Sequence, residues 1–126
     1  MGLSVGVDIV EIDRMRRAVE RHGDRFLARI YTPVEMALYR DRVPELAARF
    51  AAKEAVSKTL GVGLNHISIH GIGWHEVEVL SDAFGKPLVR LSGRAEELAK
   101  QQGLRDWAIS LSHGRDHAVA FVVAMG

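Results

Sequence analysis

The sequence predicts an α+β fold in which antiparallel strands pack against helices. Apolar, β-branched segments with the two-residue alternation of strands lie at both ends of the chain. The last two such segments are separated only by a short polar turn, which favours a hairpin. Between the ends, apolar residues recur with helical spacing in segments bounded by capping residues. Helices that alternate loosely with strands, combined with hairpins, indicate α+β rather than α/β.

The first third of the chain predicts a strand followed by two helices. Residues 4–10 form the strand, and residues 11–22 change to helical period until Gly23 stops the helix. Thr32, Pro33 and Glu35 have the form of a capping box with proline at the first helical position, so a short helix is expected from there to about Arg40.

The remaining elements follow from the same signals. A longer helix is expected over residues 44–60, closed by Gly61 and carrying a core face of mostly small residues. After an irregular crossing at residues 61–73, the prediction is a half-buried strand at 77–79, a Gly85-Lys86-Pro87 turn, a strand at 88–91, a helix from a Ser92 cap to Gly103, and a hairpin of 108–112 and 117–125.

Length and composition exclude several classes of function. The 126 residues suit one domain spanning 1–126, and 48% hydrophobic with 26% charged residues is a globular composition. Seventeen Lys and Arg against sixteen Asp and Glu argue against a nucleic-acid binder, which needs a strongly basic face. With no cysteine, thiol catalysis, Cys-ligated zinc and disulfides are excluded. The N-terminus is too short and acidic for a signal peptide, so we expect a cytoplasmic protein.

Asp8 is a carboxylate inside an apolar strand. Burying such a group is costly unless a cation or a hydrogen-bond donor meets it. Asp is also a favoured cap residue, and capping of the following helix is an equally good reading.

Residues 49–61 form the second candidate site. Glu54 and Lys58 lie one helical turn apart, with Lys53 on the same flank. This spacing fits a solvated ion pair worth about 0.3–0.5 kcal/mol. It also fits a face that binds Mg²⁺ through Glu54 and anionic oxygens through the lysines, with Asp8 as the second carboxylate.

Two further groups of polar residues stand out. Ser112 and His113 are neighbours on a strand and therefore point to opposite faces, so His113 is better read as a ligand contact or a turn residue than as a base for Ser112. Arg14, Arg17 and Arg21 form a basic stripe at helical spacing, either a docking surface or a solvated face partly neutralised by neighbouring acids.

Three blocks of the sequence resemble the holo-[acyl-carrier-protein] synthases, the small type of 4′-phosphopantetheinyl transferase. Residues 6–14 resemble the G-x-D-x-x-x-x-x-R block, and residues 49–61 resemble the signature R-F-A-x-K-E-A-x-x-K-x-x-G nearly letter for letter. Residues 110–120 resemble the closing S-x-S-H…A-x-A hairpin, and the G-K-P turn also matches at 85–87. The resemblance covers essentially the whole chain.

The resemblance implies transfer of the 4′-phosphopantetheine arm of coenzyme A to a serine of an apo acyl carrier protein, in support of fatty acid synthesis. By resemblance, Asp8 and Glu54 hold Mg²⁺ and Lys58 meets the phosphates, while the proton acceptor is either Glu54 or a water on the metal. The residues implied to line the coenzyme A cleft are Arg49, Lys53, Lys58, Gly61, Pro87 and His113.

The resemblance also implies a homotrimer with its cleft between subunits, so that His113 would serve a site whose Asp8 lies on another copy. Arg14 matches the carrier-contacting arginine of the family, and the basic stripe would then bind the acidic carrier. Two alternatives stay open at this point. One is a non-catalytic regulator that binds coenzyme A or a nucleotide on the same fold, and the other is a structural oligomer that would show no Mg²⁺ dependence.

Overall fold

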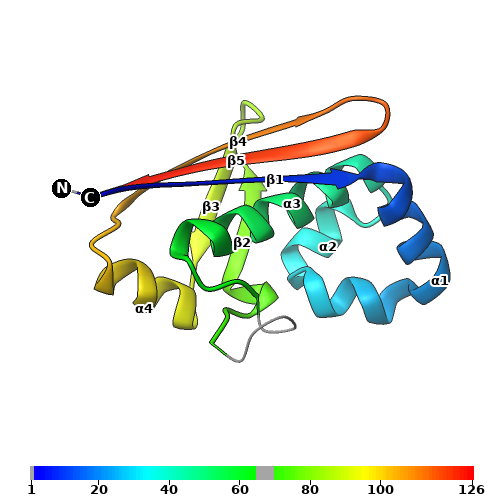
Figure 1. Cartoon of the computed structure of the whole chain (residues 1–126). Coiled ribbons are helices and arrows are strands. Elements are labelled where there is room, and N and C mark those ends of the chain that lie inside the picture. The colour runs from blue at the N-terminus through cyan, green and yellow to red at the C-terminus, as the bar shows by residue number, and fades with distance from the viewer. Residues whose placement is uncertain (1, 65–69) are drawn as a thin grey trace.

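The computed structural model describes residues 2–64 and 70–126, so part of the predicted irregular crossing at 61–73 lies outside the described residues. The elements in chain order are β1 (Leu3–Glu11), α1 (Ile12–Ile30), α2 (Pro33–Tyr39), α3 (Val43–Leu60), a 3-10 turn (Trp74–Glu76), β2 (Val77–Ser81), β3 (Pro87–Leu91), α4 (Gly93–Gln101), β4 (Asp106–His113) and β5 (His117–Met125). Figure 1 shows the helices gathered on one side of the long strands.

The strands form two antiparallel sheets, which confirms the predicted class. The larger sheet has the order β1-β5-β4, with the C-terminal strand in the middle, and β2 pairs with β3 in the smaller one. Leu3 lies opposite Met125 and Glu11 opposite His117, so the first and last strands pair along their full length. The two chain ends therefore lie side by side (Figure 1).

Helix α3 packs across the inner face of the larger sheet and forms the centre of the core. Its alanines, together with Val56 and Leu60, are buried, and the helix packs mainly against β1 and β5. The approach is close enough to exclude a side chain at Gly6, where a Cβ atom would lie 2.1 Å from the carbonyl oxygen of Ala55. Strand β1 is thereby held tightly against α3, which fixes the position of Asp8 relative to that helix.

One helix boundary and one helix cap differ from the sequence prediction. Gly23 does break α1, with φ of 59°, but a second helical segment continues to Ile30 because Leu27 and Ile30 are buried apolar anchors. The capping box of α2 is confirmed. Ser92 precedes α4 but its side chain makes no capping bond. Instead, Glu76 Oε2 accepts from the backbone N–H of Arg94 at 2.6 Å, so the cap comes from a distant carboxylate.

The outer face of the larger sheet is apolar and uncovered. The residues of β1 that point away from α3, and their neighbours on β5, are exposed: Leu3, Val5, Val7, Ile9, Phe121 and Met125. Isolated exposed apolar residues are ordinary, whereas a continuous apolar sheet face is typical of an interaction surface. Across residues 2–64 and 70–126, no helix combines the length and the apolar character needed to cross a membrane.

Candidate active site

Asp8 and Lys58 form an ion pair between β1 and α3. The register of β1 places Asp8 on the face that α3 covers, opposite Ala120 of β5. The Lys58 ammonium lies 3.0 Å from Asp8 Oδ1 and also donates to the carbonyl of Val7 at 3.1 Å. The N-cap of α1 is Glu11, so Asp8 does not cap that helix. Asp8 therefore pairs with a cation and does not cap a helix.

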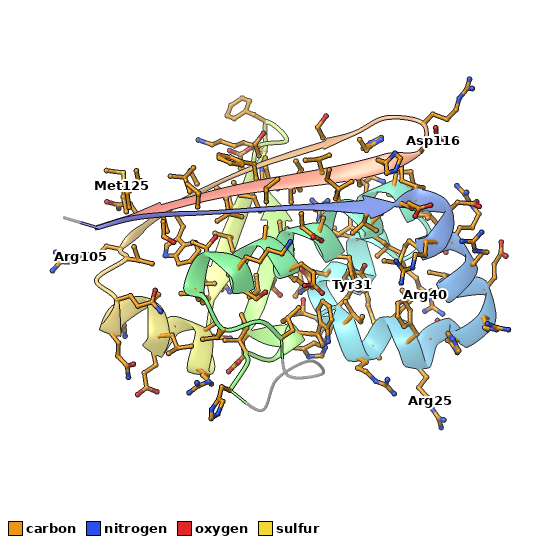
Figure 2. The ribbon with its side chains drawn as sticks, viewed as in Figure 1. Arg25, Tyr31, Arg40, Arg105, Asp116 and Met125 are labelled. Atoms are coloured by element: carbon orange, nitrogen blue, oxygen red, sulfur yellow. The ribbon has the colours of Figure 1, made fainter. Side chains whose placement is uncertain are left out.

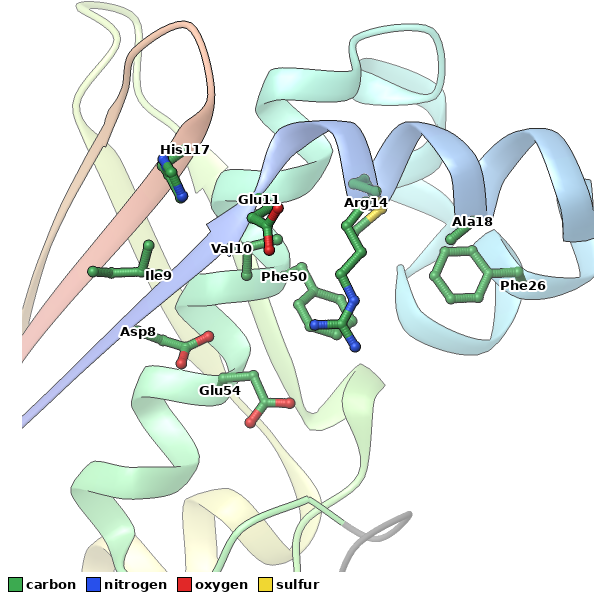
Figure 3. Close-up of a pocket in the computed structure, with 11 residues that line it drawn as sticks. Asp8, Ile9, Val10, Glu11, Arg14, Ala18, Phe26, Phe50, Glu54 and His117 are labelled. Carbon is green, nitrogen blue, oxygen red and sulfur yellow. The ribbon is translucent and has the colours of Figure 1, made fainter.

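Glu54 and Arg14 join Asp8 around one pocket of about 630 Å³. Figure 3 shows these three side chains pointing into a common space from α3, α1 and β1 respectively. The remaining wall is largely apolar and includes Phe50, whose ring lies 4.9 Å from that of Trp74 by centroid distance. Two acids and a guanidinium thus converge in a partly apolar hollow, an arrangement suited to a ligand with charged and uncharged parts.

The two carboxylates fit a magnesium ion that shares its coordination with a ligand. Within the described ranges, no group of three or more His, Cys, Asp or Glu side chains is placed to hold a metal. Mg²⁺ commonly takes only one or two protein carboxylates and completes its octahedron with phosphate oxygens and water. Asp8 and Glu54, lining the same pocket, are the carboxylates that could provide this smaller donor set.

The predicted basic stripe lines a second hollow beside this pocket. Arg14, Arg17 and Arg21 all contribute to it, and Arg17 also pairs with Asp13 at 3.3 Å. The second segment of α1 extends the stripe, because Arg25 and Arg29 line a further hollow next to Arg21 and Phe26. Figure 2 shows the Arg25 side chain projecting outward from this segment. Sequence reasoning missed this extension since it ended the helix at Gly23.

Arg49, Pro87 and His113 lie together on the other side of α3. The Arg49 side chain donates to the carbonyl of Val79 at 3.0 Å and to the hydroxyl of Ser81 at 3.1 Å, and Ser81 is the strand partner of Pro87. His113 lies 3.8 Å from Glu45, which also accepts a hydrogen bond from Arg49. Arg49 and Glu54 are about 140° apart around the helix. One chain therefore presents the predicted site residues as two separate groups, one on each side of α3.

The comparisons with known proteins decide the family. A family model described as the 4′-phosphopantetheinyl transferase superfamily matches residues 4–122. The chain belongs to this superfamily. The holo-[acyl-carrier-protein] synthase of Herpetosiphon aurantiacus is 51% identical over 126 residues, which covers 98% of this chain and 99% of that protein. The resemblance read from residues 49–61 is thus confirmed.

Solved structures of this transferase superfamily share the fold. The holo-[acyl-carrier-protein] synthase of Helicobacter pylori, in complex with coenzyme A, aligns with a TM-score of 0.83 at 31% identity, covering 96% of this chain and 99% of that one. The synthase of Bacillus anthracis, in complex with CoA (3′,5′-ADP), aligns with a TM-score of 0.76 at 30% identity, covering 96% and 94%.

The environment of Lys53 differs from the cleft-lining position that the resemblance implies for it. Its side chain is fully buried, and its ammonium donates to Glu35 Oε1 at 2.8 Å and to the carbonyls of Trp74 and Val77. All three N–H donors of Lys53 are used inside the fold. The side chain therefore has no donor left for a ligand in the cleft that the resemblance implies. Burial lowers the pKa of this ammonium, and the Glu35 carboxylate opposes part of that shift.

Gly61 closes α3 in the left-handed conformation, with φ of 77°, one turn beyond Lys58. The signature at residues 49–61 therefore ends where α3 ends, one turn after Lys58. Nothing but glycine adopts this conformation without strain, so the helix end beneath Lys58 depends on it.

Proposed function

We propose that this chain is a holo-[acyl-carrier-protein] synthase, which transfers 4′-phosphopantetheine from coenzyme A to a serine of apo acyl carrier protein. The observation that carries the proposal is that Asp8 and Glu54 line one pocket, with Lys58 paired to Asp8, in a chain of this superfamily. The holo-protein would serve fatty acid synthesis in the cytoplasm.

In this reaction the serine oxygen attacks the phosphorus that bears the pantetheine arm. The bond from that phosphorus to the oxygen of the nucleotide's 5′-phosphate breaks, and adenosine 3′,5′-bisphosphate leaves. The serine proton passes to a base in the pocket, and Glu54 is the candidate that this chain offers. Lys58, which holds Asp8 at 3.0 Å, is more than half exposed and can also meet the pyrophosphate oxygens.

Asp8 and Glu54 would hold Mg²⁺ in this site. When bound, the metal neutralises charge on the pyrophosphate and so favours the phosphoryl transfer. The role of the protein is then to position the two phosphates and the serine, because such transfers depend on charge and orientation more than on covalent help.

We assign the second group, Arg49, Pro87 and His113, to the nucleotide part of coenzyme A. These residues lie across α3 from Asp8, so a complete site would combine the two groups from neighbouring copies in a homotrimer. The uncovered apolar face of β1 and β5 is the surface on which copies would meet.

A lysine in this apolar face is expected to break the assembly. Val5 is 53% exposed and lies three residues before Asp8, the first residue of β1 that lines the pocket. Val5→Lys would place a charge in the interface, where an unpaired charge is costly. Light scattering should then give the monomer mass for the variant and about three times that mass for the parent. A parent that is monomeric at micromolar concentration would contradict the trimer.

The basic stripe is the proposed docking surface for the acidic carrier. Reversing Arg14 and Arg17 to Glu should raise the Michaelis constant for the carrier while coenzyme A binding stays nearly unchanged. Because exposed charges act mainly on the rate of encounter, the effect should shrink as salt is added. Arg105→Glu, a reversal of an exposed arginine outside the stripe, is the control. Unchanged carrier kinetics in the double variant at low salt would place docking elsewhere.

The decisive test of function is the mass of the carrier after incubation with this protein, coenzyme A and Mg²⁺. A gain equal to one phosphopantetheine group supports the enzyme, and a chelator should abolish it. A protein that binds coenzyme A but leaves every tested carrier unmodified would be the non-catalytic alternative.

A further inference from the structure

Glu45, in the first turn of α3, lies beside two arginines and a histidine. Its Oε2 atom lies 3.2 Å from Arg49 and 3.6 Å from Arg42, and its Oε1 atom lies 3.8 Å from His113. The two arginines are permanently charged, and the helix N-terminus adds partial positive charge. A single carboxylate therefore faces an excess of positive charge at this point.

Arg49 is held rigidly in this arrangement. Its Nε and one terminal nitrogen are fixed by β2, and its guanidinium carbon lies 3.7 Å from the centroid of the Tyr39 ring. The other terminal nitrogen is directed at Glu45. Arg49, whose side chain is 1% exposed, is thus a pre-positioned anion contact whose remaining donor is occupied by a residue of the same chain.

Glu45 itself is held less firmly. Only its contact with Arg49 is within hydrogen-bond distance, while Arg42 and His113 lie beyond it. The Glu45 side chain is 24% exposed, so it can turn toward solvent without crossing the core. A competing anion with more charge and more acceptor oxygens would replace it.

We propose that Glu45 is an internal competitor for the phosphate monoester on the ribose of coenzyme A. This inference rests on the proposed function, in which the pyrophosphate goes to Asp8 and Lys58 and leaves the monoester as the remaining anionic group. Without ligand, the Glu45 carboxylate neutralises part of the charge of Arg49 and Arg42 and lies beside His113. With ligand, the monoester takes its place, so Glu45 limits how strongly the chain prefers coenzyme A over dephospho-coenzyme A.

The test is the ratio of the dissociation constants of dephospho-coenzyme A and coenzyme A, measured by calorimetry at fixed ionic strength. Glu45→Gln keeps an acceptor for Arg49 but removes the charge, and it should raise the ratio roughly two- to fivefold, the size of a partly exposed ion pair. Glu97→Gln, the same change at an exposed position of α4, should leave the ratio unchanged. An unchanged or lower ratio in Glu45→Gln overturns the proposal.

A second variant keeps the test decisive if Glu45→Gln does not fold. Arg42→Gln removes an exposed cation of the cluster and should lower the ratio, whereas an unchanged ratio would overturn the proposal. Transfer to the carrier, measured by mass in the parent, separates the two ideas. If the parent transfers phosphopantetheine but the ratio is unchanged in these variants, only the role of Glu45 is wrong. If the parent does not transfer phosphopantetheine, the proposed function itself is wrong.

Discussion

Replacing Glu54 by Gln, or Asp8 by Asn, is expected to slow transfer to the carrier by roughly 100-fold or more, the scale of losing one electrostatic contact to a charged transition state. Both acids line the pocket, and both would hold the metal beside the pyrophosphate. The substitutions keep side-chain size, so thermal unfolding should change little for Glu54→Gln. Initial rates at saturating coenzyme A and Mg²⁺ are the measurement.

Matched controls separate this effect from a general change of charge. Glu97→Gln on α4 and Asp106→Asn at the start of β4 make the same substitutions at exposed positions. Both should transfer at the parental rate. A Glu54 or Asp8 variant within a few-fold of the parent would remove that acid from the metal site.

Lys53→Met is expected to lower the free energy of unfolding by about 3–5 kcal/mol, because it leaves Glu35 charged and buried without its cation. The corresponding loss in melting temperature is on the order of 10–20 °C. Glu35 keeps its bonds from the N–H groups of Thr32 and Val79, but these do not neutralise its charge. Denaturant unfolding followed by circular dichroism measures the change.

Lys100→Met is the control for this prediction. Lys100 pairs with Glu96 at 3.0 Å, but its side chain is 75% exposed, so its loss should cost less than about 1 kcal/mol. Adding Glu35→Gln to Lys53→Met should restore part of the lost stability, since no buried charge then remains unpaired. Equal costs for Lys53→Met and Lys100→Met would contradict the buried pair.

The pH dependence gives an independent check on Lys53. Its pKa in the folded chain is lowered below the ordinary value of 10.5, mainly by burial. Between the lowered pKa and 10.5, the unfolded chain holds a proton that the folded chain has released. The contribution of Lys53 to the free energy of unfolding should therefore rise with pH in this window. The difference between the parent and Lys53→Met, measured across it, should grow accordingly.

The sequence predicted most elements correctly because their local signals are strong. The capping box at Thr32 starts a helix, and the glycine at Gly61 ends one, through contacts within a few residues. The pairing of β1 with β5 is different, since it joins the two ends of the chain and no local pattern specifies it. The second segment of α1 was missed because its reason, the burial of Leu27 and Ile30, is tertiary.

The same distinction applies to the candidate site. Helical spacing placed Glu54 and Lys58 on one flank, and the structure adds that Lys58 reaches Asp8 from fifty residues away. Spacing alone assigned Lys53 to that flank as well, but the buried Glu35 captures it. Whether a lysine faces solvent or an internal acid depends on what packs against the helix, and periodicity does not carry that information.

The internal position of Lys53 also changes how the signature at residues 49–61 should be read in other chains. The motif mixes residues that maintain the architecture, such as Lys53, with residues that face the pocket, such as Glu54, and these two sets meet different physical requirements. A relative that keeps Arg49 and Lys53 but has lost the counterpart of Glu54 would still fold in the same way. Such a chain would match the motif at most positions and still be a scaffold without transferase activity.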